Sequence, residues 1–172
     1  NVFRYYYFVH AENEEKYRYA HLVDAITFIP YGVAIDEFQH FVYENPEVTH
    51  KEWCAKWREI EKKYLPHRKY DESEFLDNGG YWMRQSHIFG SPFYYIDYTL
   101  AQVVAFQFFV ENEKNHQRAW NKYVRLCKLG GKYPFTQLVE KAHLNNPFVE
   151  GTVKKVVKPL KKYLSTFDTT KF

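Results

Sequence analysis

The stretch that decides the fold is residues 13–45, "NEEKYRYAHLVDAITFIPYGVAIDEFQHFVYEN". Apolar side chains recur in it every three or four positions, which is the spacing that places them on one face of an α-helix. Pro30 and Gly32 lie inside this pattern, and we expect them to kink the helix. The Asn45-Pro46 pair predicts its end, because the residue before a proline disfavours helical geometry.

The same periodicity predicts helices along the rest of the chain. Thr49, with Glu52 three residues later, is typical of a helix N-terminus, and we expect that helix to end before Pro66. Residues 67–80 are polar and close on two glycines, which indicates an exposed connection with one short helix. Residues 96–114 are apolar nearly all round and predict a buried helix, followed by a helix that stops at Gly130-Gly131. Shorter helices are expected at 134–144 and 151–164, the second kinked or interrupted at Pro159.

No alternation typical of strands is found, so we expect a mainly α fold. The predicted organisation is a single helical lobe over residues 1–172. It has two long helices in 1–65, a connecting segment in 66–92, a buried helix pair in 93–130 and C-terminal helices in 131–172. The chain begins with Asn1 and an aromatic run at residues 3–9, and aromatic residues make up 20% of it. We therefore expect a fragment whose apolar surface contacts further protein.

Composition excludes several classes of function. A net charge of +3, a pI of about 8.7 and a mean hydropathy of -0.60 describe a mildly basic, polar chain. No apolar run reaches the roughly 18 residues of a membrane helix, and no Lys/Arg cluster typical of nucleic-acid binding is present. Two cysteines, Cys54 and Cys127, without a signal-peptide pattern suit a reducing compartment. We expect a cytoplasmic protein with no nucleic-acid or membrane partner.

The sequence offers little support for a metal site. Zinc peptidases of the gluzincin type need a His-Glu pair in their zinc motif, and "HE" does not occur here. Glu-x-x-His, which places both residues on one helix face, occurs four times, at Glu37/His40, Glu47/His50, Glu113/His116 and Glu140/His143. We interpret these as surface polar residues with a partly buried His40, and a Glu/His metal-binding helical protein is the minor alternative. No Cys-x-x-Cys or phosphate-binding loop is present.

The strongest candidate site lies in "QSHIFGSPFYYIDYTLAQ", residues 85–102. The break at Gly90-Ser91-Pro92 predicts that His87 lies on a loop or at a helix end. Tyr94, Tyr95 and Tyr98 are expected to begin the buried helix, with Tyr94 and Tyr98 one turn apart. A histidine and a tyrosine hydroxyl aimed at one point can hold a carbonyl oxygen as it becomes an oxyanion. The alternative is that these rings are core aromatics with satisfied hydroxyls.

From about Glu14 to Leu164 the sequence resembles the C-terminal part of the thimet oligopeptidase and oligoendopeptidase F family of zinc metallopeptidases. The motifs that carry the resemblance include "FIPYGVAIDEFQHFVYENP", "GGYWMRQSHIFGSPFYYIDYTLAQ" and "NNPFVEGTVKKVV". The resemblance implies a helical lobe that forms one wall of a channel for short peptides. It also implies that the HExxH helix and a third ligand, a glutamate, lie upstream of the matched region. This sequence contains neither.

The resemblance assigns roles to the central motif. It implies catalytic donors at His87, Tyr98 and Tyr94, in a reaction where water polarised by zinc attacks the peptide carbonyl and an upstream glutamate acts as base. Substrate contacts are implied at Tyr95, Ser91 and Gly90. Tyr98 is favoured as the donor to the oxyanion, with Tyr94 next. The implied cofactor is zinc in the parent enzyme, with no metal ligand in this chain, and the implied partners are short peptides and the upstream part of the peptidase. This chain alone is expected to be inactive, and a non-catalytic peptide-binding module is the alternative.

Overall fold

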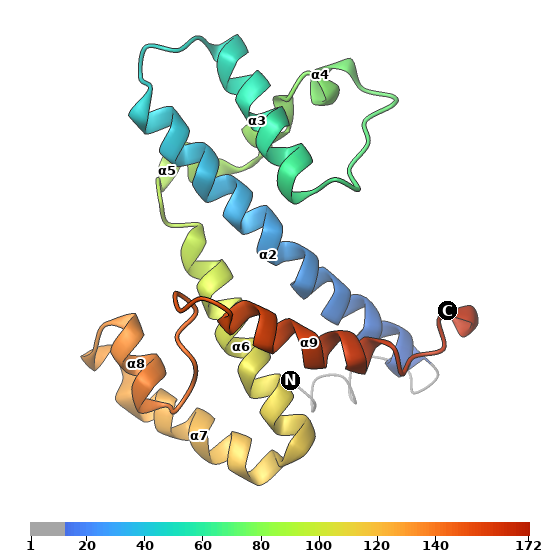
Figure 1. Cartoon of the computed structure of the whole chain (residues 1–172), viewed down its shortest axis with the longest axis vertical. Helices are drawn as coiled ribbons and strands as arrows, with labels where there is room; N and C mark the ends of the chain where they lie inside the picture. Colours follow the sequence, from blue (N-terminus) through green and yellow to red (C-terminus); the bar gives the residue numbers. More distant parts are fainter. Residues whose placement is uncertain (1–12) are drawn as a thin grey trace. The chain divides into compact units, whose positions relative to one another are not determined.

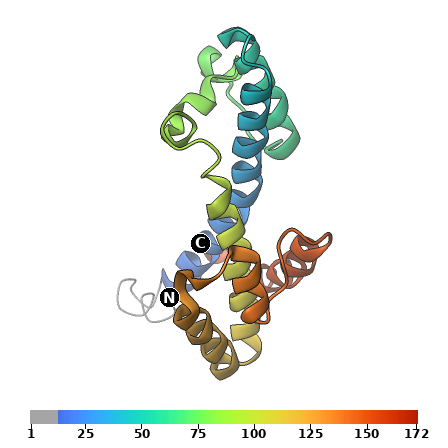
Figure 2. The same cartoon turned by 90° about the vertical axis from the view of Figure 1, so that its left-hand side faces the viewer.

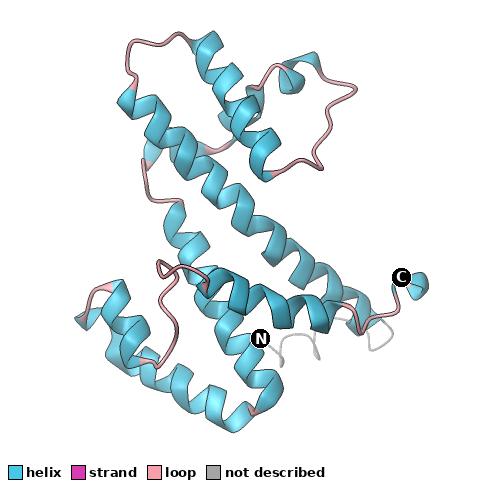
Figure 3. Cartoon of the chain, viewed as in Figure 1, coloured by secondary structure: helices cyan, strands magenta, loops and turns pink. Residues whose placement is uncertain are grey.

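A computed structural model describes residues 13–172, and this part of the chain is helical, with no strand among those residues (Figure 3). The predicted mainly α fold is therefore confirmed. The aromatic run at residues 3–9 lies outside the described residues. No helix in the described range is long and apolar enough to cross a membrane.

The contacts group the chain into two compact units. One unit is Ile26–Thr99, and the other combines the residues before it with Leu100–Phe172. Helices α2 (Glu14–Glu44) and α6 (Ile96–Lys114) each contribute to both units. The expected single helical lobe over residues 1–172, with its internal boundaries, stays a prediction.

In the unit of residues 26–99, helix α3 (His50–Tyr64) lies beside the C-terminal part of α2 (Figure 1). It begins as predicted, because the Thr49 side chain accepts from the Glu52 backbone N–H and the Glu52 side chain accepts from the Thr49 backbone N–H. The Phe38 and Trp57 rings pack edge to face across the two helices, with centroids 5.4 Å apart. They belong to a core of Ala34, Ile35, Phe38, Trp57, Ile60, Trp82 and Tyr95.

Helix α2 runs without a break through Pro30. A glycine is needed at position 32 for a different reason, because α6 approaches the α2 backbone closely there. A Cβ atom at Gly32 would lie 1.9 Å from the Thr99 hydroxyl oxygen, far inside contact distance. The glycine in "PYG" therefore sets how closely these two helices pack within the unit.

The segment between α3 and α6 folds into three short helical pieces. These are α4 (Glu74–Asp77), the 3-10 helix η2 (Gly80–Arg84) and α5 (Ser86–Gly90). The single short helix expected in residues 67–80 is α4. Gly79 has φ +93°, and a Cβ atom there would lie 1.9 Å from the Cys54 carbonyl oxygen, so only glycine fits this turn.

The second unit contains the C-terminal part of α6, α7 (His116–Leu129), the 3-10 helix η3 (Gly130–Lys132), α8 (Phe135–Lys141), α9 (Thr152–Leu164) and the 3-10 helix η4 (Thr169–Lys171). Helix α8 packs on α7 (Figure 2). Helix α9 contacts α6 through Tyr163 and Phe109, whose ring centroids are 5.0 Å apart. Helix α9 is not interrupted at Pro159. Within this chain α7 buries only Ala119 and exposes Trp120 and Tyr123.

Candidate functional site

The structure brings His87 and the three tyrosines into one cluster. His87 is the second residue of α5, at a helix end as predicted. Its ring centroid lies 6.4 Å from that of Tyr94, 5.1 Å from that of Tyr95 and 5.7 Å from that of Tyr98. The Tyr94 and Tyr98 centroids are 5.3 Å apart. We call these four residues the histidine–tyrosine cluster, and all of them belong to the unit of residues 26–99.

The three tyrosines differ in accessibility. Tyr94 is 48% exposed and Tyr98 is 42% exposed, whereas Tyr95 is 9% exposed and lies in the hydrophobic core. Tyr94 and Tyr95 do not begin the helix as expected, because α6 starts at Ile96. Tyr94 instead follows the turn, and Tyr98 stands in the first turn of α6. Two tyrosine rings are thus accessible beside a half-buried histidine.

The surroundings keep the hydroxyls of Tyr95 and Tyr98 protonated. Interaction with the Tyr94 hydroxyl, and then burial, raises the pKa of Tyr98 above its ordinary value of 10.0. Burial, followed by the nearby Tyr98, raises the pKa of Tyr95. A phenol that keeps its proton at neutral pH remains a hydrogen-bond donor. The cluster therefore offers donors and no carboxylate of its own.

The turn between His87 and Tyr94 is held from α2. The Ser91 backbone N–H donates to the His87 carbonyl oxygen at 2.9 Å, and both Gly90 and Ser91 are exposed. Phe93 has φ +60°, an unusual conformation for a bulky side chain. Its backbone N–H donates to Oε1 of Gln39, a buried residue of α2, at 2.9 Å. A strained residue fixed by a buried partner is typical of segments whose geometry matters for function.

Two polar residues beside His87, Gln85 and Tyr31, were not predicted from the sequence as part of this site. The Gln85 side-chain nitrogen lies 2.6 Å from Nδ1 of His87, and the Tyr31 hydroxyl donates to Oε1 of Gln85 at 3.1 Å. Tyr31 is on α2, 54 positions before Gln85. No local pattern could have indicated this contact.

The Glu-x-x-His pairs do not form a metal site in the described structure. No group of three or more His, Cys, Asp or Glu side chains able to hold a metal ion is found among residues 13–172. The expectation of a partly buried His40 is wrong, since its side chain is 59% exposed and lies 3.7 Å from Asp36. Its neighbour in the pair, Glu37, instead binds Lys63 at 2.8 Å. His40 is exposed because it lies on the face of α2 opposite the buried Phe38.

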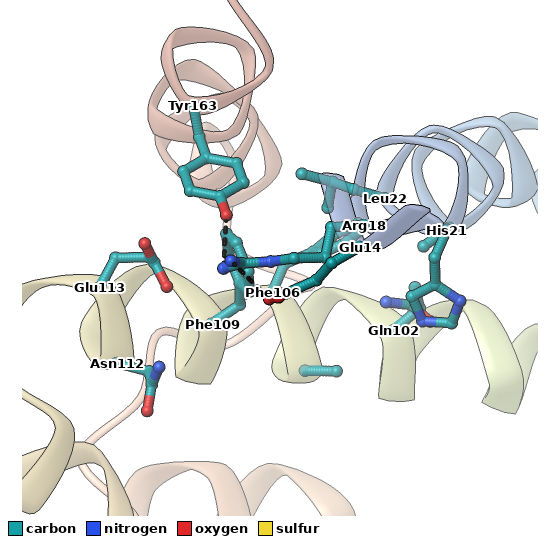
Figure 4. A pocket seen from close by; sticks show the side chains of 12 residues that line it. Glu14, Arg18, His21, Leu22, Gln102, Phe106, Phe109, Asn112, Glu113 and Tyr163 are labelled. Atoms are coloured by element: carbon teal, nitrogen blue, oxygen red, sulfur yellow. Dashed lines mark hydrogen bonds and ion pairs between the residues drawn. The ribbon is translucent and has the colours of Figure 1, made fainter. Parts of the chain in front are cut away.

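A pocket in the other unit, of about 170 Å³, is the second candidate (Figure 4). Its apolar wall includes Leu22, Phe106 and Phe109. Arg18 at its edge donates to the Tyr163 hydroxyl at 2.8 Å and lies 3.5 Å from a Glu14 oxygen. The Arg18 guanidinium is thus already bound to Tyr163 and Glu14. The histidine–tyrosine cluster is therefore the better candidate for a catalytic site.

Comparison with known proteins identifies the class. The sequence matches the angiotensin-converting enzyme family of peptidases over residues 8–166. The chain therefore belongs to this metallopeptidase family.

Solved structures give the more particular likeness. A structure described as putative oligoendopeptidase F is 54% identical, with a TM-score of 0.88 over 91% of this chain and 28% of that chain. PZ peptidase A with an inhibitor is 53% identical, also with a TM-score of 0.88 and the same coverage. A putative oligoendopeptidase F from Bacillus anthracis is 46% identical, with a TM-score of 0.77 over 94% of this chain and 26% of that chain.

The resemblance to oligoendopeptidase F predicted from the sequence is confirmed. This chain spans less than a third of the length of those structures. A comparison with curated proteins found no match.

Proposed function

We propose that this chain is the C-terminal segment of a zinc-dependent cytoplasmic oligopeptidase that hydrolyses short peptides. In this proposal the histidine–tyrosine cluster supplies hydrogen-bond donors to the carbonyl group that is cleaved. The observation that carries the proposal is the convergence of His87 with the accessible rings of Tyr94 and Tyr98. Because the chain belongs to a peptidase family, we interpret these donors as groups that bind the carbonyl of a peptide substrate.

Each residue of the cluster receives a role. When a peptide carbonyl becomes tetrahedral its oxygen gains negative charge, and fixed donors stabilise that charge more than they stabilise the substrate. We assign Tyr98 as the main donor, because it is accessible and anchored in the first turn of α6. Tyr94 and His87 are the additional donors. The exposed Gly90 and Ser91 offer backbone groups to the peptide, and Tyr95, mostly buried, contacts substrate only at its edge.

Zinc does not fit the described residues of this chain, which contain no group of three potential ligands. We therefore assign the zinc ligands to the remaining part of the peptidase. The donors described above act on the substrate and not on the metal. The chain alone is proposed to be inactive.

A non-catalytic peptide-binding module is the second candidate. It is favoured by the same finding, that accessible aromatic donors occur without a metal-binding group in residues 13–172. The two candidates differ in what happens when the rest of a peptidase is supplied.

The test adds the upstream segment of an oligoendopeptidase F to this chain and measures zinc content and cleavage of a quenched-fluorescence peptide. The proposal predicts association and zinc-dependent cleavage that neither part shows alone. A His87→Ala chain should associate equally well but restore little cleavage. A chain that binds peptide but never associates or restores cleavage would favour the binding module.

A further inference from the structure

The geometry points to Gln85 as a positioning residue that fixes which nitrogen of His87 carries the proton. We propose that the Gln85 amide donates to Nδ1 of His87, so that neutral His87 carries its proton on Nε2 and presents it as a donor. The two side-chain nitrogens lie 2.6 Å apart. The catalytic role of this Nε2–H donor rests on the proposed function. The position of the proton does not depend on it.

The direction of the bond follows from Tyr31. A carboxamide has a donor end and an acceptor end, and a neutral imidazole has one nitrogen of each kind. If Oε1 of Gln85 faces Tyr31, its NH₂ group faces His87, and Nδ1 must then accept. The opposite arrangement would place the NH₂ group on the Tyr31 oxygen and require a proton on Nδ1. The state of the Tyr31 hydroxyl decides between the two.

The Tyr31 hydroxyl is a donor that needs an acceptor. Burial raises the pKa of Tyr31, so the phenol keeps its proton. Among the described residues, the only hydrogen bond of this hydroxyl goes to Oε1 of Gln85, at 3.1 Å. The Arg68 guanidinium carbon lies 5.0 Å from the centroid of the Tyr31 ring, and a guanidinium has no acceptor to offer. A buried hydroxyl proton without an acceptor costs about 1–3 kcal/mol, which favours the arrangement with Oε1 toward Tyr31.

The amide is itself held in place by packing. The Tyr31 ring makes edge contacts with Tyr81 and Tyr95, at centroid distances of 6.2 Å and 5.9 Å. Tyr95 in turn contacts the His87 ring edge to face. Gln85 is half-buried and directly precedes α5, whose second residue is His87. The imidazole is thus fixed on its Nδ1 side, while Nε2 has no hydrogen-bond partner among the residues that the structure describes.

The consequence concerns the site. A neutral imidazole with its proton on Nε2 can donate to a carbonyl oxygen at neutral pH without first becoming charged. The same ring with the proton on Nδ1 would present a lone pair and could only accept. Gln85 therefore determines whether His87 can act as one of the proposed donors.

The decisive variant is Gln85→Glu. A carboxylate of the same shape can still accept from Tyr31, but its second oxygen has no proton and must accept from Nδ1–H of His87. Packing and both contacts are kept while the tautomer is reversed. The matched control is Gln117→Glu on α7, where the exposed Gln117 side chain donates to Oδ1 of Asn121 at 3.0 Å.

The first measurement is the tautomer itself, read by long-range ¹H–¹⁵N correlation in the full chain at about pH 9, where imidazole is neutral. The His87→Gln variant assigns the His87 signals, and far-ultraviolet circular dichroism verifies folding. We expect the Nε2–H form in the wild type and in Gln117→Glu, and the Nδ1–H form in Gln85→Glu. An Nδ1–H wild type, or a Gln85→Glu variant that keeps the wild-type tautomer, would overturn the inference.

The second measurement is kinetic and uses the complete peptidase at the same pH of about 9. At lower pH the carboxylate in Gln85→Glu would favour imidazolium, which carries a proton on both nitrogens. Gln85→Glu should lower kcat by about a hundredfold to a thousandfold, the usual effect of losing one oxyanion donor, with KM changed only a few-fold. Gln117→Glu should leave both unchanged. A reversed tautomer with unchanged kcat would refute the donor role of His87 in the proposed function. A wild-type Nδ1–H form would instead refute the role of Gln85 and donation by neutral His87, while the Tyr98 donor of the proposed function would be untouched.

Discussion

The side-chain oxygen of Gln39 accepts a hydrogen bond from the backbone N–H of Phe93 at 2.9 Å, across 54 positions of sequence. Gln39 is 1% exposed on α2, and Phe93 holds a φ of +60° in the turn before Tyr94. The bond therefore connects a core helix to the strained turn that places the accessible tyrosines.

Replacing Gln39 with leucine should weaken this connection. The Phe93 N–H would lose its partner, and the expected loss is about 1–3 kcal/mol in the free energy of unfolding. Urea denaturation followed by circular dichroism measures it. Gln117→Leu, at an exposed position of α7, is the control and should change stability by less than about 0.5 kcal/mol. Equal stabilities of the two variants would show that the bond does not hold the turn.

The close approach of Gly32 and Thr99 predicts that substitutions at these two positions have non-additive effects on stability. Gly32→Ala places a Cβ atom 1.9 Å from the Thr99 hydroxyl oxygen and should destabilise by about 1–3 kcal/mol through overpacking. That hydroxyl has no hydrogen-bond partner among residues 13–172, so Thr99→Ala alone should cost little. In the double variant the nearest of these atoms is the Cβ at position 99, at 3.2 Å, a tight contact that needs only a small shift. Gly32→Ala should therefore cost clearly less free energy of unfolding there than in the wild type. Additive effects would contradict this close approach.

A buried carboxylate gives the third prediction. Glu61 is fully buried and lies 3.1 Å from Arg58 and 3.3 Å from Arg68, with the Tyr70 hydroxyl as a further donor. Glu61→Gln removes the carboxylate that pairs with Arg68, while Arg58 keeps its pair with Asp77 at 2.9 Å. The loss should destabilise by about 3–5 kcal/mol in chemical denaturation. The control is Glu59→Gln, which removes an exposed pair with Lys56 and should cost at most about 1 kcal/mol. Similar losses in both variants would mean that Glu61 is not a central charge of the fold.

Glu37 predicts a dependence of stability on pH. Hydrogen bonds from Lys63 and Tyr64 hold the pKa of Glu37 below its ordinary value of 4.5. A carboxyl group with a lowered pKa in the folded state stabilises fully above the pKa of the unfolded state, and this contribution is lost as pH falls through the folded value. The stability difference between wild type and Glu37→Gln should therefore be constant above about pH 5.5 and shrink below about pH 4.5.

Because the Glu37 side chain is about one-third exposed, this difference should stay below about 1 kcal/mol. Thermal melts of the two proteins at a series of pH values measure it. Glu47→Gln, in the loop after α2, is the control, since Glu47 has no ion pair among the described residues. A difference between wild type and Glu37→Gln that grows on acidification would have the wrong sign.

Local signals predicted the helices well. The Thr49 capping box, the Asn45-Pro46 pair and the glycines at 130 and 131 each act within a few residues, so sequence alone could place the ends of α2, α3 and α7. For Pro159 the sequence predicted a kink or an interruption. Pro159 lies inside α9 without interrupting it, because packing of the neighbouring buried Val156 and Leu160 outweighs one lost hydrogen bond.

The candidate site was predicted only in part. The spacing of His87, Tyr94 and Tyr98 indicated that their side chains converge, and the structure brings the rings together. The start of α6 at Ile96 determines which tyrosine is buried. The sequence has no typical capping residue directly before Ile96 that would have predicted this boundary. Tyr31 and Gln39 reach the motif from α2 across more than fifty positions. Such contacts follow from the packing of helices and not from a local pattern.

The most direct test of the central claim is the turnover of a complete peptidase that carries Tyr98→Phe in this segment. The control is Tyr123→Phe on α7, because Tyr98 and Tyr123 are similarly exposed, at 42% and 48%. If Tyr98 donates to the oxyanion, its variant should lower kcat by about a hundredfold to a thousandfold with little change in KM, and the control should change neither. Full turnover in the Tyr98→Phe enzyme would contradict the assignment of this cluster as the source of the oxyanion donors.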